Sequence, residues 1–63
     1  MKKLWKTTVN NYGWNNPRTL YAETRQDAER LLNRYPAGDP VKYAGCYSDS
    51  KAAELLDYSN DNY

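Results

Sequence analysis

The sequence contains no histidine and no phenylalanine, and it has only one cysteine. Histidine is the side chain most often used for general acid–base catalysis at neutral pH. The lone thiol of Cys46 can form no internal disulfide, and without histidine the chain offers too few of the usual zinc ligands. The glycines Gly13, Gly38 and Gly45 are isolated, so no glycine-rich phosphate loop is present. We therefore predict a protein that is not an enzyme, with no catalytic residue, cofactor or metal.

Long apolar runs are also absent, and no stretch approaches the roughly 20 residues of a membrane-spanning helix. The basic start Met1-Lys2-Lys3 is followed by Leu4-Trp5 and then by Lys6, which leaves no apolar core for a signal peptide. A single free cysteine suits a reducing compartment. We predict a cytoplasmic protein that does not associate with membranes.

The 63 residues suffice for one domain, which we assign to residues 1–63. A domain of this size buries only about 60% of its unfolded surface, so it depends on close packing, self-association or a partner. The net charge of +1 is unevenly distributed. Residues 1–34 carry seven basic and three acidic groups (+4), and residues 35–63 carry two basic and five acidic groups (−3). Such a division can attract a charged partner, or it can be an ordinary solvated surface.

The strongest helical signal follows Thr24. Apolar side chains recur at positions i, i+3, i+4 and i+7, which form one face of a helix: Ala28, Leu31, Leu32 and Tyr35. Thr24 is a suitable N-cap, and Asp27 places negative charge in the first turn. We expect the helix to end before Pro36.

Three segments have the composition of strands: residues 4–9, 18–23 and 41–47. In the first, we expect Trp5 and its alternate neighbours to face the helix. In the third, two registers stay open. Either Val41, Tyr43 and Tyr47 face the helix, or Ala44 and Cys46 do. Gly45 indicates a bulge or a close contact within this third strand.

A shorter helix is expected over residues 51–58, with Ser48, Asp49 or Ser50 as its cap. Residues 59–63 are polar and are predicted to form a frayed tail. The elements together predict an α+β domain with the order β-β-α-β-α. Its three-stranded sheet has the order 2-1-3 and is covered on one face by the central helix. A right-handed crossover makes the second and third strands parallel. The second helix covers an edge or packs beside the first.

The aromatic residues are the clearest functional signal, since seven Tyr and two Trp occur without any Phe. Tyr and Trp tolerate partial exposure and are enriched at binding hot spots. We expect Trp5, Tyr35 and Tyr43 to fill the core. The segment 10–17 is rich in turn-forming residues and is expected to display its two aromatic rings. The predicted partner-binding residues are Lys6, Tyr12, Trp14, Arg18 and Tyr21.

Three hypotheses follow from this pattern. In the first, these aromatic rings anchor a protein partner, with Arg18 and Lys6 at the rim. In the second, they stack on single-stranded nucleic acid (RNA) while Lys6, Arg18 and Arg25 contact phosphates, a hypothesis weakened by the low net charge. In the third, the chain is a structural homodimer that pairs through an edge strand such as residues 41–47.

The stretch Leu20-Tyr21-Ala22-Glu23-Thr24-Arg25-Gln26-Asp27-Ala28, with Leu31-Leu32, resembles small phage-encoded accessory proteins, some of which are anti-CRISPR inhibitors. This resemblance covers less than a third of the chain. It implies a non-catalytic inhibitor that blocks a bacterial host protein or protein complex by occupying its surface, in the cytoplasm of the host cell. Because such families share no functional residues, the resemblance assigns no site.

Overall fold

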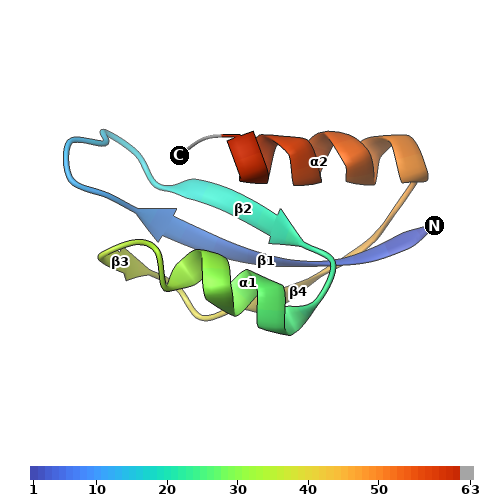
Figure 1. Cartoon of the computed structure of the whole chain (residues 1–63), viewed down its shortest axis with the longest axis horizontal. Helices are drawn as coiled ribbons and strands as arrows, with labels where there is room; N and C mark the ends of the chain where they lie inside the picture. The colour runs from blue at the N-terminus through green and yellow to red at the C-terminus, as the bar shows by residue number, and fades with distance from the viewer. Residues whose placement is uncertain (62–63) are drawn as a thin grey trace.

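Within residues 1–61, four strands and two helices make up the fold, and Figure 1 shows their arrangement. The computed structural model describes residues 1–61. The elements are β1 (Lys2–Asn10), β2 (Arg18–Ala22), α1 (Arg25–Leu32), β3 (Ala37–Gly38), β4 (Lys42–Tyr47) and α2 (Asp49–Asp61). The predicted α+β class is confirmed. Within the described residues, neither helix is long and apolar enough to cross a membrane.

The central strand is β1. β2 pairs with it antiparallel on one side, and β3 and β4 pair with it antiparallel in succession on the other. β2 and β4 therefore run parallel to each other, as predicted, and the order 2-1-3 is confirmed. The two-residue strand β3 was not predicted. It is separated from β4 by Asp39, Pro40 and Val41, where the backbone N–H of Asp39 still donates to the carbonyl of Thr8 at 2.8 Å.

The helix α1 begins where the sequence predicts. The hydroxyl of Thr24 accepts a hydrogen bond from the backbone N–H of Asp27 at 3.1 Å, which caps the first turn. The helix ends earlier than predicted, at Leu32, so Tyr35 lies beyond it. The backbone N–H of Tyr35 donates to the Leu32 carbonyl at 3.2 Å, and the Tyr35 ring still packs against the core.

One face of the sheet carries the main apolar core, because α1 packs on β1 and β2. The buried members of this core are Val9, Leu20, Ala22, Ala28 and Leu31, with Trp5, Trp14, Leu32, Tyr35 and Val41 packed against them. The expected orientation of Trp5 toward α1 is therefore confirmed.

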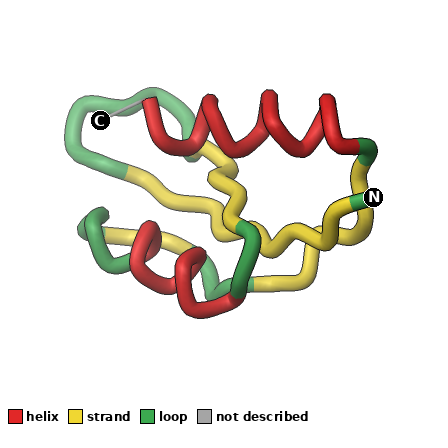
Figure 2. The backbone as a smooth tube through the Cα atoms, turned by 45° about the vertical axis from the view of Figure 1, so that its right-hand side comes forward, coloured by secondary structure: helices red, strands yellow, loops and turns green. Residues whose placement is uncertain are grey.

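The opposite face is covered by α2, which lies mainly over the edge strand β2, so the alternative that α2 packs beside α1 is wrong. Figure 2 shows the strands between the two helices. α2 packs mainly on β2 and also contacts β1. Leu4 points to the face opposite Trp5 and is fully buried, as is Ala52 of α2. The protein thus has three layers with a small second core.

The predicted frayed tail is wrong for residues 59–61, because α2 continues to Asp61. Ser59 is fully buried. Its hydroxyl donates to the Leu55 carbonyl at 2.8 Å and accepts from the Tyr21 backbone N–H at 2.7 Å. The second bond satisfies a donor on the outer edge of β2, which protects that edge from pairing with other strands. Residues 62 and 63, also predicted to fray, lie outside the described residues.

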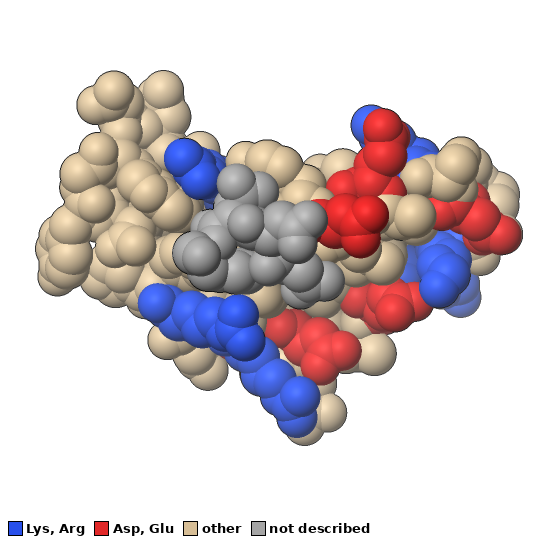
Figure 3. All heavy atoms as spheres, turned by 45° about the horizontal axis from the view of Figure 1, so that its top comes forward, with Lys and Arg blue, Asp and Glu red and all other residues tan. Residues whose placement is uncertain are grey.

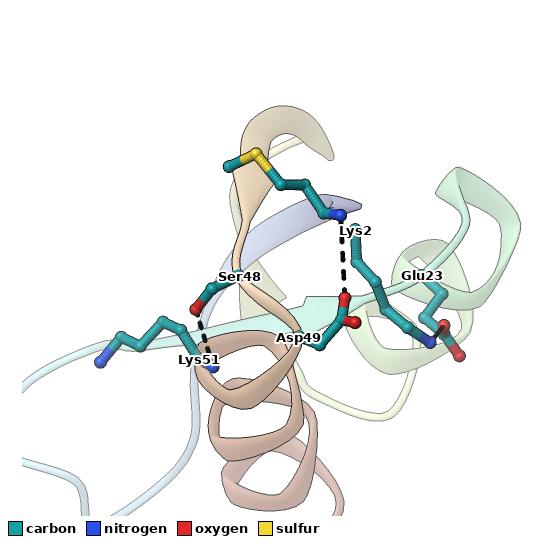
Figure 4. Close-up of polar contacts among 6 residues, drawn as sticks. Lys2, Glu23, Ser48, Asp49 and Lys51 are labelled. Atoms are coloured by element: carbon teal, nitrogen blue, oxygen red, sulfur yellow. Dashed lines mark hydrogen bonds and ion pairs between the residues drawn. The ribbon is translucent and has the colours of Figure 1, made fainter.

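The start of α2 is held by polar contacts that Figure 4 shows. The hydroxyl of Ser48 accepts from the Lys51 N–H at 3.3 Å, so Ser48 is the cap among the three candidates. The N-terminal amine lies 3.8 Å from the Asp49 carboxylate in the first turn of α2. Nearby, Lys2 Nζ donates to Glu23 at 2.7 Å, which raises the pKa of Lys2 above its ordinary value. Because both ion pairs are exposed, they contribute little to stability.

A β-bulge in β4 decides which of its side chains face α1. Leu4 pairs with Gly45 but Trp5 pairs with Tyr43, which leaves Ala44 as the extra residue. Gly45 has a φ of +113°, a conformation that favours glycine. The bulge predicted at Gly45 is confirmed. The bulge reverses the alternation of side chains along β4. Val41 and Tyr43 therefore lie on the α1 face, and Tyr47 lies on the α2 face. Neither of the two predicted registers is correct.

Replacement of Gly38 by alanine is expected to destabilise the protein by about 1–2 kcal/mol. A Cβ at this position would collide with Cδ1 of Leu32 and lie 2.9 Å from the carbonyl oxygen of Thr8. The first atom can move, whereas the second belongs to the central strand. Urea denaturation of the wild type and Gly38→Ala measures the difference. An unchanged midpoint would mean that β3 can separate from β1 without cost.

Candidate functional site

The β1–β2 loop, residues 11–17, is held in a defined turn. The backbone N–H of Trp14 donates to the carbonyl of Asn11 at 3.2 Å, and Gly13 has a φ of +83°. A glycine with positive φ at the third position is typical of a type II turn. The side-chain oxygen of Asn11 accepts from the Tyr12 N–H at 2.8 Å. The turn therefore fixes the backbone on both sides of the Tyr12 ring.

Tyr12 is the most exposed aromatic side chain among the described residues, with 87% of its surface accessible. Its predicted exposure is confirmed. A hollow of about 290 Å³ beside it is lined by Asn10, Asn11, Tyr12, Pro36 and Ala37. Pro36 and Ala37 follow α1 in the chain, so the β1–β2 loop and the α1–β3 connection meet at this end of the molecule. We call this region, comprising residues 11–17 and 35–37, the loop end.

Trp14 is placed differently from Tyr12. Its ring is half-buried against the main core, with its centroid 5.4 Å from that of Tyr35. The guanidinium of Arg18 lies 4.3 Å from the Trp14 ring centroid, within the range of a cation–π contact. Trp14 thus anchors the loop to the body of the protein, and the expectation that it is displayed to solvent is only partly correct.

The loop end lacks charge. Residues 10–17 and 35–38 contain no Lys, Arg, Asp or Glu. Figure 3 shows the end of the molecule that carries the loop as an uncharged surface, while charged groups gather over the rest of this face. Asparagine, proline and aromatic side chains thus make a polar but neutral surface, with Arg18 at its border. Depletion of charge with enrichment of aromatic rings is typical of the centre of a protein–protein interface.

The other two predicted binding residues, Lys6 and Tyr21, are not part of the loop end. They pair with each other across β1 and β2 and lie on the α2 face. The Tyr21 ring is half-buried, with its centroid 6.0 Å from that of Tyr47. Burial raises the pKa of the Tyr21 phenol, and the neighbouring Tyr47 adds to this effect. Tyr21 therefore packs partly against its own protein, and of the predicted residues the structure brings together only Tyr12, Trp14 and Arg18.

Tyr43 was assigned to the core, but this is wrong, because 49% of its surface is exposed. The ring packs against Trp5 edge to face, with centroids 5.3 Å apart. The helix α1 packs on β1 and β2, which leaves the ring of Tyr43 on β4 at the margin of that face. A hydrogen bond with the Cys46 thiol, together with slight burial, raises the pKa of the Tyr43 phenol.

Carboxylates gather at one further hollow, of about 270 Å³, near β2 and the two helices. Glu23 and Asp27 line it together with Arg30 and Arg34. Glu23 is ion-paired with Lys2 at 2.7 Å and Asp27 with Arg30 at 3.5 Å. These carboxylates are therefore explained as partners of neighbouring basic groups. Across the residues with described side chains, no three His, Cys, Asp or Glu side chains gather in a way that could hold a metal ion.

Comparison of the chain with protein-family models, with curated proteins and with solved structures finds no match.

Proposed function

We propose that this protein is a non-catalytic binding module that docks on another protein through the loop end. Following the sequence resemblance, we propose a phage or mobile-element inhibitor, similar to anti-CRISPR proteins, that blocks a host protein complex in the bacterial cytoplasm. The observation that carries the proposal is Tyr12, an aromatic ring held almost fully exposed on a defined turn. A rigid amphipathic ring loses little conformational entropy on binding, and its burial contributes a large contact area.

The surroundings of Tyr12 support the same proposal. Trp14 and Tyr35 fix the loop from beneath, so the turn is ordered before a partner arrives. The uncharged loop end suits the desolvated centre of an interface, and Arg18 suits its rim. A charged ligand such as nucleic acid finds no charge to pair with at residues 10–17. The loop end therefore favours a protein partner over nucleic acid.

We expect Tyr12→Ala to weaken partner binding about 30-fold or more, which is the effect of losing a hot spot of about 2 kcal/mol. The melting temperature should stay unchanged, because the ring contacts little of its own protein. The measurement is capture from a nuclease-treated bacterial lysate, followed by titration of the purified partner against both proteins.

The matched control is Tyr58→Ala, which removes another exposed tyrosine, located on α2. This variant should bind like the wild type. Equal binding by Tyr12→Ala and the wild type would exclude the loop end as the anchor. Capture that disappears after nuclease treatment would instead indicate a nucleic-acid ligand.

A further inference from the structure

Among the described side chains, three lysines form no ion pair, and all three lie on the neighbouring strands β1 and β4. The ion pairs between described side chains engage Lys2, Arg25, Arg30 and Lys51. The lysines outside these pairs are Lys3, Lys6 and Lys42. Positive charge that the protein leaves uncompensated in one region attracts an anionic ligand.

Two of these lysines are placed at a cost to the fold. Lys6 lies directly opposite Lys42 in the β1–β4 register. Like charges in this position destabilise a sheet. Lys6 and Lys42 line a shared hollow, and the acidic residue Asp39 lines it too. Asp39 offsets part of the charge, since it lines the same hollow as both ammonium groups. The opposed pair Lys6 and Lys42 destabilises the sheet but concentrates positive charge. A ligand that binds at these two lysines explains this arrangement.

An exposed aromatic ring stands beside these lysines. Tyr43 follows Lys42 in β4, and its ring faces the other side of the sheet, where it packs edge to face on Trp5. Lys3 lies on that same side, opposite Cys46 in the register. The four side chains Lys3, Lys6, Lys42 and Tyr43 thus border both faces of β4, and we call them the β4 strip.

We propose that the β4 strip binds single-stranded nucleic acid, with a base stacked on Tyr43 and phosphates paired with the three lysines. Aromatic stacking combined with lysine–phosphate pairing is the usual chemistry of sequence-tolerant single-strand binding. β4 lies at an edge of the sheet, so a flexible strand can pass around it and reach lysines on both faces. A duplex is too stiff to make this turn, and its paired bases leave no free face for Tyr43.

An acidic protein segment is the less favoured ligand. Lysine is depleted at protein interfaces. An extended peptide would also need a regular strand edge for backbone pairing, and the bulge at Ala44 and Gly45 interrupts that edge. The side chains of the β4 strip, rather than its backbone, therefore decide the ligand.

The test is fluorescence anisotropy of a labelled oligothymidylate at low salt, titrated with the full chain. The wild type should bind, and its affinity should fall with a linear dependence on the logarithm of salt concentration. Lys42→Gln should reduce the slope of log K against log salt by about 0.7, the value for one phosphate contact on a single strand. Tyr43→Ala should weaken binding about 5- to 100-fold, and Tyr43→Phe should bind like the wild type, because stacking needs only the ring.

Two further variants make the test sharper. Asp39→Asn should tighten binding, because it removes the carboxylate that shares the hollow with Lys6 and Lys42. Lys51→Gln is the matched control, since it removes the same charge from α2, where Lys51 pairs with Glu54. It should leave the slope and the affinity nearly unchanged.

Each opposite outcome would overturn the proposal. Absence of binding at low salt excludes the ligand. An equal loss in Lys51→Gln and Lys42→Gln shows attraction by net charge without a site. Binding of a duplex as tight as that of the single strand, with no effect of Tyr43→Ala, excludes stacking. Binding of polyglutamate that depends on the same lysines, without binding of the oligonucleotide, assigns the β4 strip to an acidic protein.

Discussion

Replacement of Leu4 by alanine is expected to lower the free energy of unfolding by about 2–5 kcal/mol, as for other fully buried leucines. Leu4 fills the small core between the sheet and α2, where Ala52 is its fully buried counterpart. A chain of 63 residues has a total stability of roughly 3–9 kcal/mol. The variant should therefore lose a large share of its stability.

Urea denaturation followed by circular dichroism measures this loss, and Leu55→Ala provides the comparison. Leu55 belongs to α2 but is only half-buried, so its truncation should cost clearly less. A loss below about 1 kcal/mol for Leu4→Ala would mean that α2 does not form a second core with the sheet.

The main layer of this fold could be predicted because its signals are local. The cap at Thr24, the apolar spacing through Leu31 and the alternation around Trp5 each depend on residues close in sequence. Together they determine where the first helix begins and which face of the sheet it covers. These predictions agree with the structure.

The second layer could not be predicted in the same way. Leu4 alternates with Trp5, and only the position of α2 shows that the Leu4 side is buried too. Ser59 looks like a polar tail residue, but its hydroxyl satisfies Tyr21 from 38 positions away. The bulge at Gly45 was expected, but its effect on the facing of Tyr47 depends on the pairing with β1. Each of these features is determined by contacts that are distant in sequence.

The candidate site shows the same division. The composition of residues 10–17 predicts a turn, and the exposure of Tyr12 follows from it. The sequence gives no means to distinguish Trp14 from Tyr12, since both are aromatic residues beside Gly13. What separates them is Tyr35, which approaches Trp14 from the far end of α1. Tyr43 was missed as an exposed ring because α1 packs mainly on β1 and β2, which leaves β4 at the margin of that face.

Trp14→Ala is expected to destabilise the protein by roughly 2–4 kcal/mol, somewhat less than the 3–5 kcal/mol for a fully buried tryptophan. The sequence alone predicts no loss of stability for this change, with an effect on binding only. In the structure the Trp14 ring contacts Tyr35 and Arg18 and packs on the main core. Its removal separates the loop from the α1–β3 connection and leaves the Arg18 guanidinium without its ring.

Thermal and urea denaturation of Trp14→Ala, Trp14→Phe and Tyr12→Ala distinguish these two predictions. Trp14→Phe should recover part of the stability, because a smaller ring still reaches Tyr35. Tyr12→Ala should melt like the wild type. If Trp14→Ala also melts like the wild type, its ring is not part of the core, and the loop is not fixed in the way proposed here. If it is destabilised as expected, a binding defect in that variant reflects loss of the ordered turn. Tyr12 is then the residue whose truncation tests direct contact with the partner.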